Sequence, residues 1–273
     1  MKFVKTILSL AVLLSALFLS ACSILEQITP ANNGDEDVVI HQLIDTLYED
    51  EDFRAFHSST ENMNIIAQFY NTLNNHDDLL FLGISDQYLF AEDIKVIEDA
   101  SEKSEYVGGH WMVPSLFLNQ NAFHFFDLKV QAGTPFDWSA INLDDDVLPA
   151  IMGANYTDLY QLGDEIEVLF FIRPITIKII GFLDTNHRAM AYNDESFYEI
   201  DSYIILPMVE QLPPFDGLEG EELFHYAITS FAMINGYIAE PRQREDIDKI
   251  LNDIGDDVGF RHFDLFAVPI DEV

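Results

Sequence analysis

Residues 166–183 read IEVLFFIRPITIKIIGFL. The run is rich in β-branched and aromatic residues, which favour extended strands. Arg173 and Pro174 divide it, so the sequence predicts two strands, Ile166–Ile172 and Ile175–Leu183, arranged like a hairpin. This is the clearest pair of strands in the chain.

Shorter apolar runs on both sides of this pair predict further strands and turns. We expect strands at 79–84, 87–91, 111–118 and 203–206, the last closed by Pro207, and a run at 127–130 that leads into a turn at 133–135. Between these strands, residues 155–162 predict a short helix.

Helical spacing marks the two ends of the folded region. Val39, Leu43 and Leu47 repeat at helical spacing and predict a first helix that opens the folded region near Val38. A second helix is expected after Ser59 or Thr60, either of which can cap it, and before residues 74–78. Its apolar face is formed by Met63, Ile66, Ala67, Tyr70 and Leu73.

The last predicted helix lies between Pro241, which suits a first helical position, and Gly255, which suits the position after a helix end. A closing strand is expected at 260–268. Helices at both ends and mixed strands between them predict an α+β fold of mixed sheets with flanking helices, and not an alternating, doubly wound sheet.

The first 22 residues predict export and lipid attachment. Lys2 and Lys5 precede an almost wholly apolar run, residues 7–19, and small residues lead into Cys22, the only cysteine. This arrangement is typical of an export signal. With a cysteine after the cleavage site it resembles a bacterial lipobox, which implies a diacylglyceryl thioether on Cys22. The alternative is an uncleaved membrane helix at 3–21, slightly short of the 20 or so residues needed to span a bilayer.

We therefore expect a signal peptide at 1–21, a flexible tether at 22–37 and an extracytoplasmic domain at 38–273, anchored to the membrane of the bacterial envelope.

The amino-acid composition limits the classes of partner that the protein can bind. The chain carries 48 acidic and 13 basic residues, a formal charge of -35. Because nucleic-acid phosphates would be repelled, we expect no nucleic-acid partner. Electrostatic binding to anionic lipid is equally disfavoured.

No catalytic or cofactor motif stands out, so we expect no enzyme activity, cofactor or metal. The sequence holds no Gly-x-Ser-x-Gly, His-Glu-x-x-His or phosphate-binding Gly-rich loop with lysine. The eight histidines are dispersed. His110 and His124 have the most apolar neighbours, and packing explains them better than metal ligation. Phe123, Phe125 and Phe126 are expected in the core.

Three acidic clusters, residues 49–52, 144–146 and 256–257, offer oxygen ligands for calcium. None has the alternating aspartate spacing of a calcium loop, so solvated surfaces explain them better. Cys22 is the only residue to which the sequence assigns a function.

The middle of the chain resembles a known family. Residues 121–136, NAFHFFDLKVQAGTPF, resemble a phenylalanine-rich run in the MacB-like periplasmic core domain. The segments 148–153, 162–166, 180–183 and 203–208 follow in that family's order. Residues 65–84 are similar to the extracytoplasmic domains of FtsX-type permeases. The chain departs from the family at Thr134, where arginine is usual, and it stops at Val273, where membrane helices normally follow.

The resemblance implies a fold with a porter and an inserted β-rich subdomain. It also implies a non-catalytic module that couples ATP-driven movements of membrane helices to substrates or proteins outside the membrane. The expected partners are the membrane, an ABC permease and ATPase, or an envelope protein. Two alternatives stay open: a lipoprotein that binds a small molecule or cation, and an exported hydrolase. We expect a surface poor in pockets, with an apolar patch at a protein contact.

Overall fold

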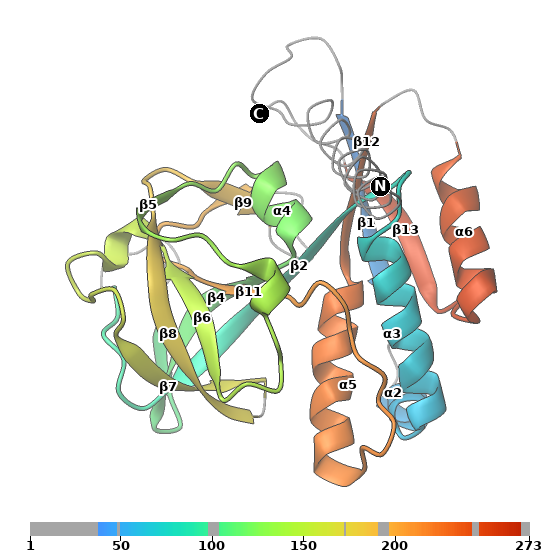
Figure 1. The fold of residues 1–273 in the computed structure, drawn as a ribbon, viewed down its shortest axis with the longest axis horizontal. Coiled ribbons are helices and arrows are strands. Elements are labelled where there is room, and N and C mark those ends of the chain that lie inside the picture. The colour runs from blue at the N-terminus through green and yellow to red at the C-terminus, as the bar shows by residue number, and fades with distance from the viewer. Residues whose placement is uncertain are drawn as a thin grey trace, which may run out of the picture.

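The structure is a computed structural model that describes residues 38–47, 50–97, 104–171, 173–190, 197–241 and 246–268. Its longer helices gather on one side and most of its strands on the other (Figure 1). We call residues 38–83 and 220–268 the helical part and residues 84–207 the β-rich part. Residues 208–219, which lead from the second to the first, are called the strap.

The helical part is a sheet in the order β13-β1-β12-β2, with helices on one face. Leu43, Phe81 and Ile238 lie on the covered face and pack in one core with residues of α3, α5 and α6. The elements are β1 (Val38–Asp45), α2 (Asp50–His57), α3 (Thr60–Asn74), the start of β2 (Leu80–Ala91), α5 (Gly220–Ile234), β12 (Gly236–Pro241), α6 (Ile247–Val258) and β13 (Phe263–Val268).

The first predicted helix is wrong, because residues 38–45 form strand β1. This strand pairs with β12 on one side and with β13 on the other. Ile40 and Leu43 are both 1% exposed, and they belong to different core clusters. A strand buried on both faces carries apolar residues without strict alternation, and here their spacing coincides with that of a helix.

The second predicted helix is confirmed as α3. The hydroxyl of Ser59 caps it by accepting a hydrogen bond from the Asn62 backbone N–H, and its core residues include the five that helical spacing singled out. The helix ends at Asn74, inside the polar run expected to stop it.

The last helix is present, but its predicted limits are wrong. Pro241 ends strand β12, and the helix begins at Ile247. Gly259, with φ 83°, caps the helix end in the left-handed region that glycine tolerates. Gly255 lies inside the helix, where a Cβ would approach the carbonyl oxygen of Phe260 to 2.4 Å. Gly255 therefore serves close packing, and not helix termination.

The β-rich part is built around a ring of strands. Strand β2 pairs with β7 at one residue pair and with β4 along eight, so the order β2-β7-β8-β6-β11-β4 returns to β2. Its elements are β3 (Glu105–Val107), β4 (His110–Leu118), α4 (Gln120–Phe125), β5 (Val130–Gly133), η1 (Trp138–Ala140), β6 (Val147–Met152), η2 (Ala154–Tyr156), β7 (Glu165–Phe170), β8 (Arg173–Leu183), β9 (Arg188–Met190), β10 (Phe197–Glu199) and β11 (Ile204–Pro207).

The predicted hairpin is confirmed as β7 and β8, which pair antiparallel from Glu165–Lys178 to Phe170–Arg173. The turn comes earlier than expected, because Arg173 and Pro174 are already part of β8. Phe171, in the turn, has φ 52°, a region that bulky residues rarely adopt. Its ring packs against Phe117 and Phe170, which holds it there. The helix expected at 155–162 is a single short turn, η2.

Strand β2 joins the two parts. The sequence predicts two strands here, but one twelve-residue strand pairs with β12 at its start and with β4 further on. At the crossing point, a Cβ on Gly83 would lie 2.9 Å from the Met208 sulfur and 3.2 Å from Asn119 Cγ. Asn119 itself is 1% exposed. The two parts therefore meet at a tightly packed junction.

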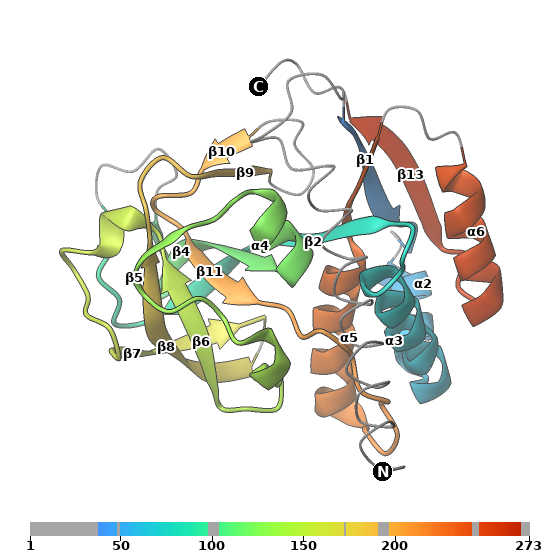
Figure 2. The same ribbon diagram turned by 45° about the horizontal axis from the view of Figure 1, so that its top comes forward.

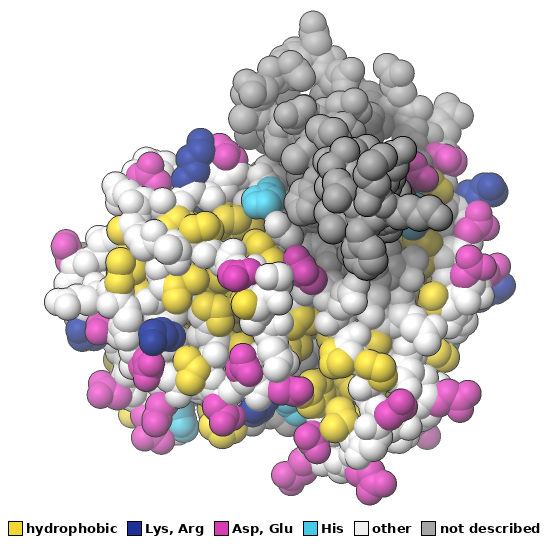
Figure 3. Space-filling model, in the orientation of Figure 1, with side chains coloured by type: hydrophobic (Ala, Val, Ile, Leu, Met, Phe, Trp, Pro, Cys, Tyr) yellow, Lys and Arg dark blue, Asp and Glu magenta, His cyan; other side chains and the backbone are white. Residues whose placement is uncertain are grey.

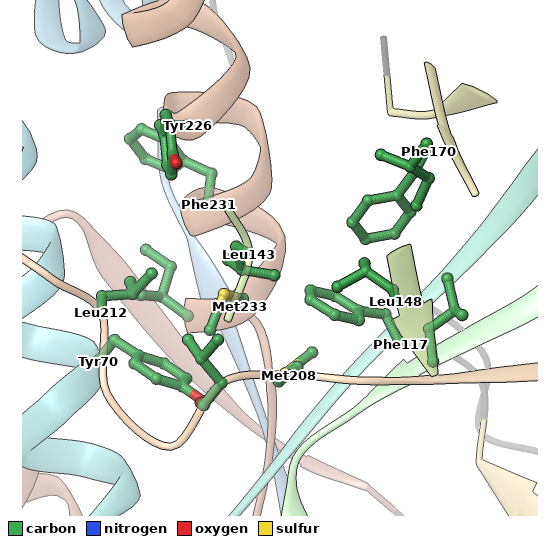
Figure 4. Packing of buried hydrophobic residues seen from close by; sticks show 14 of the residues in the cluster. Tyr70, Phe117, Leu143, Leu148, Phe170, Met208, Leu212, Tyr226, Phe231 and Met233 are labelled. Atoms are coloured by element: carbon green, nitrogen blue, oxygen red, sulfur yellow. The ribbon is translucent and has the colours of Figure 1, made fainter. Parts of the chain in front are cut away.

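A continuous hydrophobic core also connects the parts. Phe117, Leu148 and Phe170 of the ring belong to the same buried cluster as Tyr226 and Met233 of α5 (Figure 4). A second cluster lies outside the ring, where Phe123 and Phe125 are buried, as predicted for these two residues, and Phe126 packs partly buried beside them. The α+β class, with mixed sheets and flanking helices, is confirmed.

The first and last described strands bring the ends of the domain together. Ile40 of β1 lies opposite Val268 of β13. In both views β1 lies above α5 (Figures 1 and 2). The chain therefore enters and leaves the sheet at the end remote from the start of α5.

Candidate functional site

A groove of about 860 Å³ lies between the β-rich part and the start of α5. Its apolar lining includes Pro174, Phe215, Leu218, Phe224 and Tyr226. Its carboxylates come from segments far apart in sequence: Asp144, Asp216, Glu221 and Glu222. In the lower centre of Figure 3, hydrophobic side chains lie between acidic ones at this place.

One wall of the groove is the strap, which polar side chains of α3 hold in place. Asn71 accepts a hydrogen bond from the Leu212 N–H (2.7 Å) and donates one to the Leu212 carbonyl (2.9 Å). About two helical turns earlier in α3, Asn64 accepts a hydrogen bond from the Phe215 N–H (2.7 Å) and donates one to Asp216 (3.0 Å). Residues seven apart lie on one helix face. This irregular segment is therefore fixed by α3.

The same face of α3 fixes the beginning of the strap. The Tyr70 hydroxyl donates to the Val209 carbonyl (2.6 Å), and Asn74 donates to the Glu210 carbonyl (2.9 Å). Tyr70 is fully buried, and burial together with the charge of Glu210 raises the pKa of its hydroxyl above the ordinary value. Tyr70 therefore stays a neutral donor.

The other wall is fixed by Arg173. Its guanidinium donates to the carbonyls of Leu143 (2.9 Å) and Asp144 (3.2 Å) and to the Asp146 carboxylate (3.1 Å). An arginine can satisfy several acceptors of one loop at once because its donors form a rigid planar fork. The guanidinium of Arg173 therefore makes these hydrogen bonds to the loop that carries Asp144, within the same wall of the groove.

His225 lies in the groove beside Arg173. Burial, and to a lesser degree the charge of Arg173, lowers the pKa of His225 to about 4 from the ordinary 6.5. Its Nδ1 is buried and has no hydrogen-bond partner among the described residues. The imidazole is therefore neutral at pH 7 and adds no positive charge to the groove.

Acid is expected to destabilise the protein through His225. Between pH 6.5 and 4 the unfolded chain binds a proton at this residue that the folded chain does not, so the free energy of unfolding falls as pH falls. A His225→Gln variant should lose less stability across this window, measured as the urea midpoint from pH 7 to pH 4.

Nuclear magnetic resonance titration of the His225 ring separates the two causes. In Arg173→Met the pKa of His225 should rise but stay below 6.5, because burial is the larger cause. An ordinary titration near 6.5 in the unmodified protein would contradict this assignment.

The structure separates the histidines and acidic clusters that the sequence singled out. His110 begins β4, 3.6 Å from Glu92 at a second groove of about 620 Å³, whereas His124 is exposed on α4. Of the acidic clusters, Asp146 pairs with Arg173 and Asp256 with Arg261, while Glu51 and Asp52 are exposed on α2. Within the described ranges, no three His, Cys, Asp or Glu side chains converge as metal ligands.

Cys22, the predicted lipidation residue, lies outside the described residues, as do Glu49 and the whole of 1–37. Among the helices that the structure does describe, none combines the length and apolarity needed to cross a bilayer. Two open grooves lie on the surface of the described residues, and the expectation of a surface poor in pockets stays a prediction. Sequence reasoning missed both, because their walls meet only through tertiary folding.

No protein-family model matches the chain, and no curated protein matches it. Among solved structures, it is similar to the extracellular domain of the noncanonic ABC-type transporter YknZ from Gram-positive bacteria, with 14% identity and a TM-score of 0.40 over 84% of this chain and 100% of that one. It is also similar to the periplasmic region of MacB from Actinobacillus actinomycetemcomitans, with 14% identity and a TM-score of 0.41 over 84% of this chain and 88% of that one.

Proposed function

We propose that this chain is a lipid-anchored, non-enzymatic extracytoplasmic module of an ABC-type export or signalling system, which binds a permease, a peptide or an envelope protein. The observation that carries the proposal is the ordered resemblance of residues 121–208 to the MacB-like core, downstream of a predicted signal peptide that Cys22 follows. Residues 1–21 are the signal peptide, 22–37 the tether and 38–273 the domain.

In this proposal the helical part corresponds to the porter and the β-rich part to the inserted subdomain. The chain order supports the assignment, since the β-rich residues all lie between β2 and α5. The tether joins the domain at the start of β1. The lipid would therefore be attached at that end of the sheet, remote from the start of α5 (Figure 1).

Affinity capture from bacterial membranes tests the proposal. The intact lipoprotein, carrying a C-terminal tag and crosslinked before solubilisation, is expected to co-purify with a permease and its ATPase. An unrelated lipoprotein with the same tag is the control. Consistent recovery of neither component, from membranes that contain both, would contradict the proposal.

A ligand-binding lipoprotein is the second candidate, and the groove with its perturbed His225 is the observation that favours it. Structural causes account for the low pKa of His225, namely its burial and its neighbour Arg173. Saturable binding of a small solute that shifts the His225 resonances, with no protein recovered by capture, would favour this second function.

A further inference from the structure

We propose that the groove between Arg173 and α5 docks a basic segment of a protein partner that carries an apolar anchor residue. This inference rests on the proposed function and names the chemistry of the partner at the groove. Three properties of the groove support it: its fixed walls, three exposed carboxylates that form no ion pair with a described residue, and an exposed phenylalanine in its lining.

The walls are fixed before any partner arrives. The strap is hydrogen-bonded at both Leu212 and Phe215 by α3, and the opposite loop is bonded by Arg173 at Leu143 and Asp144. Both segments are irregular and would otherwise move. A surface that is already ordered loses little conformational entropy on binding, which favours recognition of a partner.

The rim of the groove is strongly negative. The lining of the groove includes four carboxylates and one guanidinium, that of Arg173. This guanidinium is hydrogen-bonded to the loop in its own wall. Asp144, Glu221 and Glu222 are exposed, and no lysine or arginine of the described residues forms an ion pair with them. Complementary charge from a partner would relieve the repulsion among them and guide the encounter.

Phe224 supplies the apolar contact. It lies on α5 two residues after Glu222 and is 37% exposed, with its ring centroid 5.1 Å from that of His57. Leu218 and Tyr226 continue the apolar lining beneath it. An apolar surface bordered by carboxylates fits a segment in which a lysine or arginine adjoins an aromatic or aliphatic residue.

A second copy of this chain fits the groove poorly. The protein has a formal charge of -35 and only 13 basic residues, so two copies repel each other at an acidic rim. A basic partner segment meets both the charge and the apolar surface, and it is the occupant that we infer.

Binding of a synthetic peptide tests the inference. The probe is a short fluorescent peptide in which lysine and phenylalanine alternate, titrated with the folded domain at low and at high salt. We expect saturable binding that weakens with salt, about tenfold weaker binding for Phe224→Ala, and several-fold weaker binding for Glu221→Gln/Glu222→Gln. A peptide with glutamate in place of lysine should not bind.

The chain offers matched controls for both variants. Phe266→Ala removes another exposed phenylalanine, 49% exposed on β13, and Asp253→Asn/Asp257→Asn removes two charges from the exposed face of α6. Neither should change the affinity more than twofold. Equal effects of all four variants, or no binding to the unmodified domain, would overturn the inference. A dimer that Phe224→Ala dissociates would also overturn it, because the groove would then be a self-interface.

The inference and the proposed function can fail separately. If the intact lipoprotein captures a permease and the Phe224→Ala variant captures it equally well, the proposed function stands and the groove is not the contact. If capture fails while the peptide binds the groove as described, the groove stands and the proposed function fails. Urea midpoints equal to that of the unmodified protein would show that the surface variants remain folded.

Discussion

Replacing Cys22 with serine is expected to abolish lipid attachment and to leave no more than a minor share of the mature protein on membranes. Cys22 is the only cysteine, so no other thiol can form the thioether. One acyl chain gives only marginal membrane binding, whereas two give stable anchoring. Mass spectrometry of the N-terminal peptide would measure the lipid, and fractionation of envelope material would measure the release.

Ser23→Ala is the matched control, since it changes the neighbouring residue and keeps the thiol. It should be lipidated and retained like the unmodified protein. An unlipidated Cys22 in the unmodified protein, with residues 3–21 still present in the mature chain, would show that a membrane helix and not a lipid provides the anchor.

Replacing Asn119 with alanine is expected to destabilise the protein by about 2–4 kcal/mol. Its Oδ1 accepts from the Ala122 N–H (2.8 Å) and so caps α4. Its Nδ2 donates to the Phe81 carbonyl (3.0 Å) and to Asn74 (2.8 Å). Alanine would remove the acceptor of the buried Ala122 N–H and would leave the Phe81 carbonyl with Asn121 as its side-chain donor, where β2, α3 and α4 meet. Urea unfolding measures this loss of stability. The midpoint should fall, while the slope of the unfolding free energy against urea concentration should stay the same.

Two comparisons separate the roles of Asn119. Asn119→Ser keeps an oxygen that can cap α4 but removes the two donated bonds, so its stability should lie between those of the unmodified protein and Asn119→Ala. Asn252→Ala removes an exposed asparagine that bonds only within α6 and should cost less than about 0.5 kcal/mol. A loss equally small for Asn119→Ala would disprove its role at the junction.

The sequence predicted α3 well, because one face of this helix is buried, but it did not predict α2 or α5. In α3 the apolar positions and the Ser59 cap agree, so local pattern and tertiary burial favour the same structure. In β1 the local pattern and the tertiary burial do not favour the same structure. Val38, Val39 and Ile40 are β-branched and favour a strand, but burial on both faces removed the alternation that would have identified it.

Helix ends and the groove show a second limit of sequence reasoning. Gly255 and Gly259 are equally suitable as helix ends by residue type, and only the backbone conformation distinguishes them. The groove joins residues 144, 173 and 213–226, which no local pattern connects. Their meeting depends on the ring of strands and on the bonds from α3 to the strap, which are long-range features.

The pairing of Ile40 with Val268 has a consequence for how the domain can be attached to a cell surface. Because the first and last described strands run side by side in opposite directions, Val38 and Val268 lie at the same end of the sheet. An anchor attached beyond Val268 instead of before Val38 should therefore meet the sheet at the same end.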